Sequence, residues 1–431
     1  MANAPSSEAK RFEAYLERLK VSVGHADRYE PLRAYLSGLL LPGERKSVEP
    51  MAAKLDPLHV RARHQSMHHF VAQAPWSETG LLREARDYTL AQMERHAPVA
   101  AWVVDDTGMP KKGSLSVGVA HQYCGALGKA ANCQVAVTVS LANAVASVPS
   151  GFRLYLPKDW AEDLRRRKEA GVPSEVQFQT KWKLALEQID GLLADELPRA
   201  PVVADAGYGS ATDFRDGLTE RGFSYAVGIS AETSVWPPGQ EPLAPAAGKG
   251  RRRSPSRVRR SAEHQPVSVQ ILAHQLPRTS WKTVRWREGT KGTMSSRFAA
   301  VRIRPAHRDY LRSAARPVEW LLVEWPASDK EPSHFWLSTV PEDTALEDLV
   351  RLAKIRWRIE RDFQELKDEL GLDHYEGRGW RGFHHHGALC IAAYAFLAAE
   401  RARLSPPAPV AFLRSARLPR DFRPRGSAPA P

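Results

Sequence analysis

Cysteine is scarce in this chain of 431 residues. The three cysteines, Cys124, Cys133 and Cys390, are too few and too scattered for a disulfide framework, and they lack the spacing of paired metal ligands. A reducing compartment is therefore expected. Stability must come from buried apolar side chains, and a chain of this length with 43% hydrophobic residues can form two or three domains.

Long apolar segments are also absent. The longest weakly polar run, residues 387–399, is shorter than the roughly 20 residues that span a bilayer, which excludes a transmembrane protein. The segment 1–19 carries charges from its start and has no apolar core of the kind found in signal peptides. We therefore expect a cytoplasmic protein that has no membrane partner.

Acidic residues are fewer than basic ones. The 62 Lys and Arg against 49 Asp and Glu leave a net charge of +13, which favours a polyanionic partner such as nucleic acid or an anionic membrane surface. Solubility alone is the alternative explanation. The segment 249–260, KGRRRSPSRVRR, contains no acid, and two interpretations stay open for it: a contact to the DNA backbone, or a solvated loop.

Helical periodicity dominates residues 1–95, for which we predict a helical DNA-binding domain. Residues 96–230 alternate short apolar runs with amphipathic stretches. The first three strands are expected to form an antiparallel meander, and the order β-β-β-α-β-α-β predicts a mixed α/β core. The predicted strands are 100–105, 116–125, 134–143, 201–207 and 223–230, and the predicted helices are 160–169, 175–197 and 210–222.

The rest of the chain divides into three parts. Residues 231–343 form a β-rich insertion, with strand-like pieces that include VSVQILAH at 267–274. Residues 344–400 return to the core, with one helix predicted over 344–372 and a second after it. The basic, proline-rich tail 401–431 is expected to be disordered.

Three carboxylates stand out by their positions. Asp105 and Asp205 each end an apolar strand, and Glu360 lies inside the predicted helix. Acids at the ends of buried strands lie at a sheet edge, where α/β proteins bind their ligands. Two neighbouring acids repel each other unless a cation neutralises them, and Mg²⁺ prefers such oxygen ligands. Two ions about 4 Å apart can stabilise both oxygens of an in-line phosphoryl displacement.

The helix around Glu360 carries a buried apolar stripe beside a charged face. Arg356 precedes Glu360 by one turn and Lys367 follows it by two, so cations flank the acid as a phosphodiester site requires. An ordinary amphipathic helix with ion pairs four residues apart would have the same pattern. The stripe consists of Ile359, Phe363, Leu366 and Leu370.

Together these residues resemble bacterial insertion-sequence transposases of the DDE, RNase H-like superfamily. The similarity is greatest to the group whose Glu helix carries a Tyr-Arg-Glu-Lys signature: Arg356, Glu360 and Lys367 fit its spacing, whereas the Tyr position falls on Ala353. Segments 105–137, 204–209 and 373–386 resemble the blocks around the first Asp, the second Asp and the end of the Glu helix, and the whole resemblance spans residues 40–400.

The resemblance implies an α/β fold, with an RNase H-like mixed-sheet catalytic core, a β-rich insertion and a helical N-terminal domain. It implies cut-and-paste transposition, in which double-stranded DNA is cleaved at terminal inverted repeats and joined to target DNA. Asp105, Asp205 and Glu360 would be catalytic and would bind two Mg²⁺ ions, for which Mn²⁺ substitutes, with Asp106 as the alternative to Asp105. A homodimer acting on the bacterial nucleoid is expected. A catalytically inactive DNA-binding relative and a nuclease of the same fold are the alternatives.

Further basic and aromatic residues are candidates for DNA contact. Arg356 and Lys367 would bind phosphates near the cut, and so would Lys111 and Lys112, for which a solvated turn is the alternative. For Arg378, Arg381 and the histidines 384–386, we expect phosphate contact rather than a histidine metal site. Tryptophans of the insertion either stack on a base or pack in the core: Trp281, Trp286, Trp320, Trp325 and Trp336.

Overall fold

The computed structural model describes residues 6–245, 257–289 and 292–405. Residues 249–256 of the basic segment 249–260 therefore lie outside the described residues, and so does the tail from residue 406 onward. No helix in the described ranges is both long enough and apolar enough to cross a membrane.

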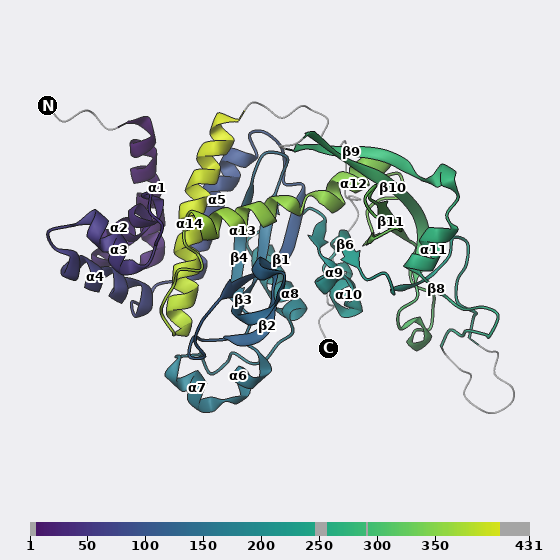
Figure 1. Cartoon of the computed structure of the whole chain (residues 1–431), viewed down its shortest axis with the longest axis horizontal. Helices are drawn as coiled ribbons and strands as arrows, with labels where there is room; N and C mark the ends of the chain where they lie inside the picture. The colour runs from purple at the N-terminus through teal and green to yellow at the C-terminus, as the bar shows by residue number, and fades with distance from the viewer. Residues whose placement is uncertain (1–5, 246–256, 290–291, 406–431) are drawn as a thin grey trace, which may run out of the picture.

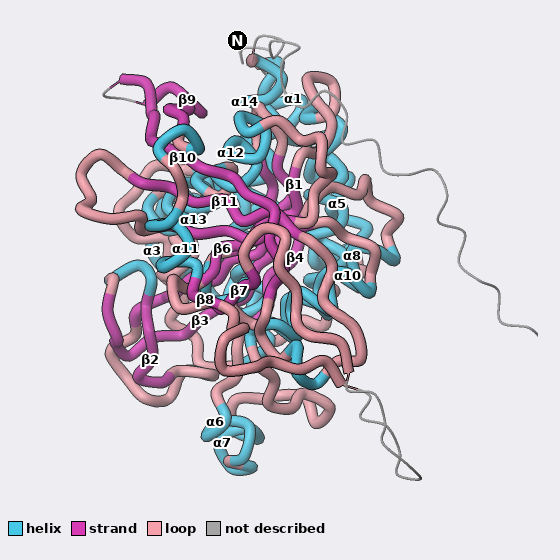
Figure 2. Tube along the Cα trace, turned by 90° about the vertical axis from the view of Figure 1, so that its right-hand side faces the viewer, coloured by secondary structure: helices cyan, strands magenta, loops and turns pink. Residues whose placement is uncertain are grey.

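The described strands form one mixed sheet through the centre of the molecule (Figure 2). Its order is β2-β3-β1-β5-β6-β12-β11-β10-β7-β8, with β4 beside β3 and β9 beside β10. The strands are β1 Ala101–Pro110, β2 Ala120–Cys124, β3 Lys129–Ala142, β4 Ser147–Leu154, β5 Val202–Ala204, β6 Tyr225–Ile229, β7 Ser234–Trp236, β8 Val267–Ser268, β9 Lys282–Gly289, β10 Gly292–Pro305, β11 Glu319–Trp325 and β12 His334–Ser338.

Helices cover this sheet and form a separate layer beside it (Figure 1). They are α1 Ser7–Val23, α2 Tyr29–Leu40, α3 Val48–Leu55, α4 Val60–Ala72, α5 Glu78–Met93, α6 Lys158–Glu162, α7 Leu164–Glu169, α8 Lys181–Ala194, α9 Ala206–Gly209, α10 Thr212–Glu220, α11 Val269–Gln275, α12 Leu346–Lys354, α13 Trp357–Asp368 and α14 Trp380–Leu404.

The core of the sheet is the part ordered β4-β3-β1-β5-β6. β1 pairs antiparallel with β3, and on its other side it pairs parallel with β5, which pairs parallel with β6. Residues on both faces of β1 and β5 are buried, which explains why these strands are continuous apolar runs rather than alternating ones. The predicted mixed α/β core is confirmed.

The strand that pairs with β3 on the side away from β1 in the core is β4, which the sequence did not predict. The run 116–125 contributes only β2, which pairs with Lys129–Cys133 of β3, whereas β4 pairs with β3 from Ala136 to Ala142. β3 is long enough to pair with both in succession. The sequence of β4, SVPSGFRL, contains Pro and Gly that conceal a strand, and Pro149 is tolerated because β4 is an edge strand.

The β-rich insertion extends the core sheet instead of forming a sheet of its own. β12 pairs antiparallel with β6, and Leu337 lies opposite Val227. One predicted strand in it was wrong: residues 269–275 form α11, because Ser268 caps a helix by accepting a hydrogen bond from the amide of Ile271. Val269, Leu272 and Ala273 are buried at helical spacing.

The helices α1, α2, α4 and α5 contact α14, which lies between α1–α4 and the sheet (Figure 1). The Tyr15 hydroxyl donates to the carbonyl of Ala392 at 2.8 Å, and the Thr89 hydroxyl donates to that of Ala395 at 3.0 Å. α14 continues to Leu404, past the predicted boundary at residue 400, and Arg401 forms an ion pair with Glu365 of α13. The N-terminal helices therefore share one hydrophobic core with the rest of the described chain.

The helix predicted over 344–372 is divided in two. α12 ends at Lys354 and α13 begins at Trp357, and the amide of Arg358 bonds to the carbonyl of Ile355 in a tighter turn between them. The two helices bury different stripes, α12 against the insertion and α13 toward β4 and β1. Arg356 lies at this junction.

Candidate active site

Asp105 and Asp205 lie at the same edge of the parallel part of the sheet. The pairing of β1 with β5 ends at Val104 and Ala204, so each acid directly follows the last residue of its strand in this parallel pairing. The prediction that Asp105 ends its strand was wrong, because β3 provides hydrogen-bond partners for β1 as far as Pro110. The acids nevertheless lie on neighbouring strands, as the expected cation site requires.

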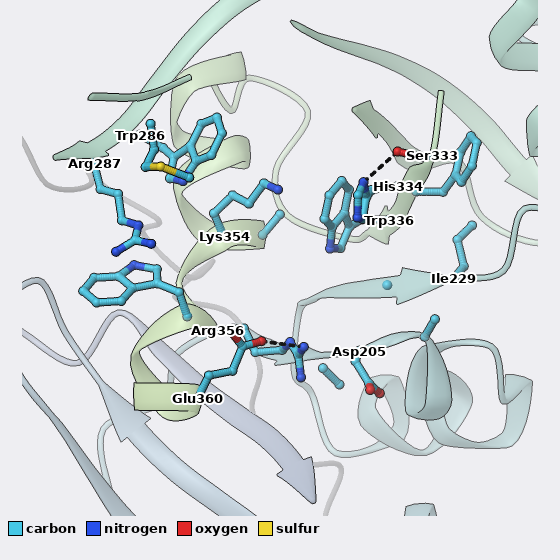
Figure 3. A pocket seen from close by; sticks show the side chains of 17 residues that line it. Asp205, Ile229, Trp286, Arg287, Ser333, His334, Trp336, Lys354, Arg356 and Glu360 are labelled. Carbon is cyan, nitrogen blue, oxygen red and sulfur yellow. Dashed lines mark hydrogen bonds and ion pairs between the residues drawn. The ribbon is translucent and has the colours of Figure 1, made fainter. Parts of the chain in front are cut away.

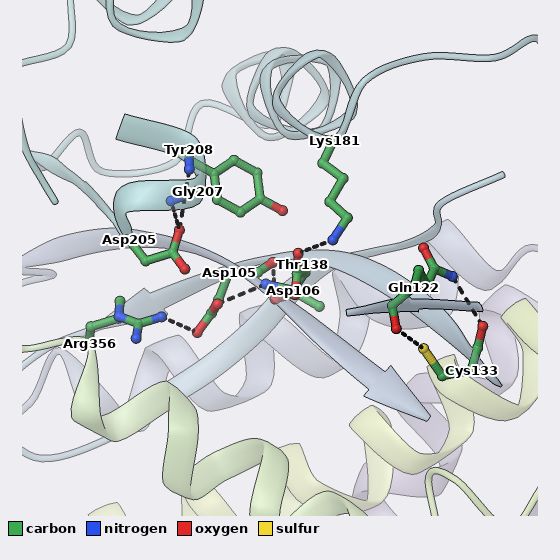
Figure 4. A network of polar contacts seen from close by, with 10 residues as sticks. All are labelled: Asp105, Asp106, Gln122, Cys133, Thr138, Lys181, Asp205, Gly207, Tyr208 and Arg356. Carbon is green, nitrogen blue, oxygen red and sulfur yellow. Dashed lines mark hydrogen bonds and ion pairs between the residues drawn. The ribbon is translucent and has the colours of Figure 1, made fainter. Parts of the chain in front are cut away.

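Asp205 is fixed by the short helix that follows it. Its Oδ1 accepts hydrogen bonds from the amides of Gly207 at 2.9 Å and Tyr208 at 3.3 Å (Figure 4). A Cβ at Gly209 would lie 2.1 Å from the carbonyl oxygen of Gly228, so only glycine allows α9 to approach β6 this closely. The residues of the ADAGYG block thus position the carboxylate.

Arg356 connects the first acid to the third. Its Nη1 donates to Asp105 Oδ2 at 2.8 Å (Figure 4), and its Nη2 donates to Glu360 Oε1 at 2.8 Å (Figure 3). The side chain of Asp105 is 15% exposed and that of Glu360 57% exposed. The two acids therefore meet through a guanidinium, one from the sheet and one from the first turn of α13.

The electrostatics of Asp105 favour a cation. Burial raises the pKa of Asp105 to about 7; Arg356 lowers it, and the neighbouring Asp205 raises it further. The pKa is raised even with Arg356 beside the carboxyl group, so a further positive group would favour the charged form.

The carboxylate oxygens of the three acids are ligands of the type that a divalent metal ion binds. In the described ranges no three His, Cys, Asp or Glu side chains are close enough to bind a metal. Arg356 lies between Asp105 and Glu360 and forms an ion pair with each. The guanidinium of Arg356 supplies a positive charge between these two carboxylates, where a metal ion would supply one. Asp205 Oδ2 and Glu360 Oε2 accept no hydrogen bond from a described residue, and such free carboxylate oxygens are the ligands that Mg²⁺ prefers.

Asp106 has a different environment from Asp105. Its Oδ2 accepts a hydrogen bond from the Lys181 ammonium at 2.7 Å, on the side of α8 (Figure 4). Because successive side chains of a strand point to opposite faces, only one of the two acids can face Arg356 and Glu360. This geometry favours Asp105 as the metal ligand.

The predicted phosphate-binding residues are not all near the acids. Burial lowers the pKa of Lys367, whereas Asp373 and, more weakly, Asp105 raise it. Lys111 donates to the carbonyls of Asp373 and Tyr375, and Lys112 is exposed beside it. Arg381 donates to the carbonyl of Gln73 at 2.7 Å, and Arg378 is exposed. Arg356 thus contacts two of the acids, whereas Lys111 and Arg381 contact other segments.

The expectation of phosphate contact by the three histidines was wrong. His384, His385 and His386 are buried in α14, with exposed fractions of 5%, 2% and 2%. His384 Nδ1 donates to the carbonyl of Trp380 at 2.9 Å while its Nε2 accepts from the amide of Leu154 at 3.2 Å. Burial lowers the pKa of each to about 4, so these side chains are neutral and pack in the interior.

A cavity of about 410 Å³ opens beside Asp205 and Glu360 (Figure 3). Trp286 and Trp336 of the insertion line it, and the Lys354 ammonium lies 5.0 and 5.2 Å from their ring centroids. The sequence did not single out Lys354, Arg287 or Trp357, which also line it. Trp357 directly follows Arg356 of the signature, and that adjacency was the one available signal.

Tyr208 is a second residue that the sequence did not single out. Its hydroxyl is buried without a hydrogen-bond partner in the described part of the chain, and burial raises its pKa well above the usual range, with Asp106 and Asp105 contributing. Removing an unsatisfied buried hydroxyl is close to neutral or stabilising. We expect Tyr208→Phe to raise the free energy of unfolding by up to about 1 kcal/mol, measured by urea denaturation. A loss of 2 kcal/mol or more would reveal a partner for the hydroxyl.

The core order β4-β3-β1-β5-β6, with acids on its two central strands and on a helix that follows the insertion, defines an RNase H-like α/β protein. The sequence profile of the DDE superfamily endonuclease family matches residues 18–293, and the chain belongs to this family. The matched range contains Asp105 and Asp205 and ends before Glu360, so the role of Glu360 depends on the geometry described above.

A named relative agrees with this assignment. The "Probable transposase for insertion sequence element IS701" of Microchaete diplosiphon is 30% identical over 233 residues, which cover 54% of this chain and 57% of the relative. The chain thus matches little more than half the length of that protein. The resemblance to DDE-type insertion-sequence transposases is confirmed by both comparisons.

Proposed function

We propose that this protein is a DNA transposase that cleaves the terminal inverted repeats of an insertion sequence and joins the released 3′ ends to target DNA. The observation that carries this proposal is the gathering of Asp105, Asp205, Glu360 and Arg356 at one sheet edge, beside an open cavity. The relative named as a probable transposase supports strand transfer in addition to cleavage.

The three acids have one role in this proposal. Asp105, Asp205 and Glu360 would hold two Mg²⁺ ions, or Mn²⁺ in their place, and bound ions would supply activation of the attacking oxygen and charge stabilisation at the leaving one. Arg356 and Lys367 bind the phosphates on either side of the scissile bond. Lys111, Lys112, Arg378 and Arg381 are proposed to contact DNA farther from the cut.

The cavity is suited to the end of a DNA duplex. Aromatic rings stack on bases of any sequence, and Lys354 and Arg287 add positive charge between the rings. On the β9–β10 hairpin that forms one wall, Arg285 and Arg297 are exposed and neither forms an ion pair within the described ranges, while Arg297 lies 4.4 Å above the Trp325 ring. Cations without acidic partners are available for phosphates.

Replacing Arg285 and Arg297 together with alanine is expected to weaken DNA binding and to reduce its salt dependence. Each lost phosphate contact lowers the slope of log K against log salt by about 0.9, so the double variant should lose about 2. Electrophoretic mobility shifts over a range of salt concentrations measure this slope. The control is the pair Arg153 and Arg308, which face Glu187 and Asp213, and their double alanine variant should keep the wild-type slope. Equal slopes in all three proteins would contradict the proposed DNA path.

The remaining parts of the proposal concern assembly. Residues 1–95 are proposed as the helical DNA-binding domain, 96–230 and 344–400 as the catalytic core and 231–343 as the insertion. Two element ends must be brought together before joining, which calls for a homodimer in the DNA complex. The place of action is the nucleoid, in the bacterial cytoplasm.

Incubation of the protein and Mg²⁺ with DNA that carries the inverted repeats flanking its own gene tests the function. Nicking, excision and joined products are expected on denaturing gels. Cleavage without joining would identify a nuclease of the same fold. Binding without cleavage in either Mg²⁺ or Mn²⁺ would identify a catalytically inactive DNA-binding protein.

A further inference from the structure

Arg356 bonds to two of the three acids. One guanidinium nitrogen bonds to Asp105 and another to Glu360, both at 2.8 Å, and Asp105 is anchored on its other oxygen by the amide of Asp106 at 2.9 Å. The positive charge therefore lies where the proposed function requires a metal ion.

We propose that Arg356 is a latch: it closes the metal site until a DNA phosphate draws its guanidinium away from Asp105 and Glu360. The inference builds on the proposed function and adds an order of events, in which DNA binds before the divalent metal. A metal ion that binds Asp105 Oδ2 and Glu360 Oε1 must break both charge-assisted hydrogen bonds of Arg356, and it must bring a second cation against the guanidinium.

The location of Arg356 allows it to move. It lies at the junction between α12 and α13, its side chain is 27% exposed, and it lines the cavity that we assign to the DNA end. A guanidinium has five N–H donors in a planar fork, and phosphate accepts two of them in parallel. A phosphate in the cavity thus competes directly with the two carboxylates for the same side chain.

A matched control is available close to the site. Lys367 carries the same charge and interacts electrostatically with Asp105, but it forms no ion pair with any described residue. Lys367→Gln therefore removes one positive charge near the acids and leaves the hydrogen bonds of Arg356 to Asp105 and Glu360 in place. Arg356→Gln removes both the charge and the two hydrogen bonds. Arg356→Lys keeps the charge, but its single ammonium cannot bond to both acids in the forked geometry of a guanidinium.

The test measures Mn²⁺ binding to the full-length, DNA-free protein by electron paramagnetic resonance of free Mn²⁺, with thermal unfolding as a second readout. We expect Arg356→Gln to bind Mn²⁺ at least tenfold more tightly than wild type, Arg356→Lys about threefold more tightly, and Lys367→Gln less than threefold. Mn²⁺ should raise the Tm of Arg356→Gln, and it should raise that of wild type only after inverted-repeat DNA is added.

Two results would overturn the latch. One is equal Mn²⁺ affinity in wild type and both Arg356 variants; the other is a gain in Lys367→Gln as large as in Arg356→Gln, which would show a general effect of charge. Failure of the proposed function would look different, because wild type would then not both cleave and join the repeats, whatever the Mn²⁺ affinities of the variants. The comparison of DNA-free variants would still test the latch. If Arg356→Gln does not fold, the comparison of Arg356→Lys with wild type decides.

Discussion

Replacing Glu360 with glutamine is expected to lower the rate of metal-dependent DNA cleavage by about a thousandfold or more, which corresponds to about 4 kcal/mol of transition-state stabilisation. The amide has nearly the shape of the carboxylate but no charge to share with a metal ion. Because Glu360 is 57% exposed and belongs to the first turn of α13, the fold should not change. Single-turnover cleavage of inverted-repeat DNA in Mg²⁺ measures the effect.

Glu365→Gln is the matched control for this substitution. Glu365 lies on the same helix, and its substitution removes the same charge. Glu365 forms ion pairs with Arg361 and Arg401 rather than with Arg356. Its variant should cleave within a fewfold of the wild-type rate. If Glu360→Gln cleaves as fast as Glu365→Gln, Glu360 is not the third acid of the site.

Acidification is expected to destabilise the protein through its buried histidines. An imidazole whose folded pKa is lowered from 6.5 to about 4 contributes stability that is present above pH 6.5 and is lost as the pH falls toward 4, because only the unfolded chain binds the proton in this window. Between pH 7 and pH 5 the loss is about 2 kcal/mol for each of His384 and His386. The raised pKa values of Asp105 and Asp362, about 7 and about 6, act in the opposite direction.

A variant of one histidine separates these contributions. His384 uses both ring nitrogens as a neutral ring, donating to Trp380 and accepting from Leu154, so a proton on its Nε2 would break the second bond. His384→Asn cannot titrate, and its loss of stability from pH 7 to pH 5 should be about 2 kcal/mol smaller than that of wild type. Urea unfolding at the two pH values, in a metal chelator, measures the difference. Identical pH dependence in both proteins would show that His384 is not held neutral.

The sequence alone determined the local features of this protein. Continuous apolar runs predicted the buried strands that carry Asp105 and Asp205, and the apolar stripe with its charged face predicted the helix of Glu360. These patterns depend on neighbours within about four residues, so they can be read before any tertiary contact is known. The family signature added the spacing of Arg356, Glu360 and Lys367.

Tertiary structure decided how these pieces combine. The pairing of β6 with β12 joins residues more than a hundred positions apart, and no local pattern encodes it. The break at Ile355 and Arg356 follows from two helices that pack on different surfaces, and it puts the guanidinium between Asp105 and Glu360. Similarly, the burial of the histidines 384–386 results from long-range contacts that no local pattern encodes. His384 accepts a hydrogen bond from the amide of Leu154 in β4, whereas His385 and His386 bond to Val71 and Tyr35 of the N-terminal helices. The sequence states which side chains can carry a charge, but packing between distant segments determines which groups surround each of them.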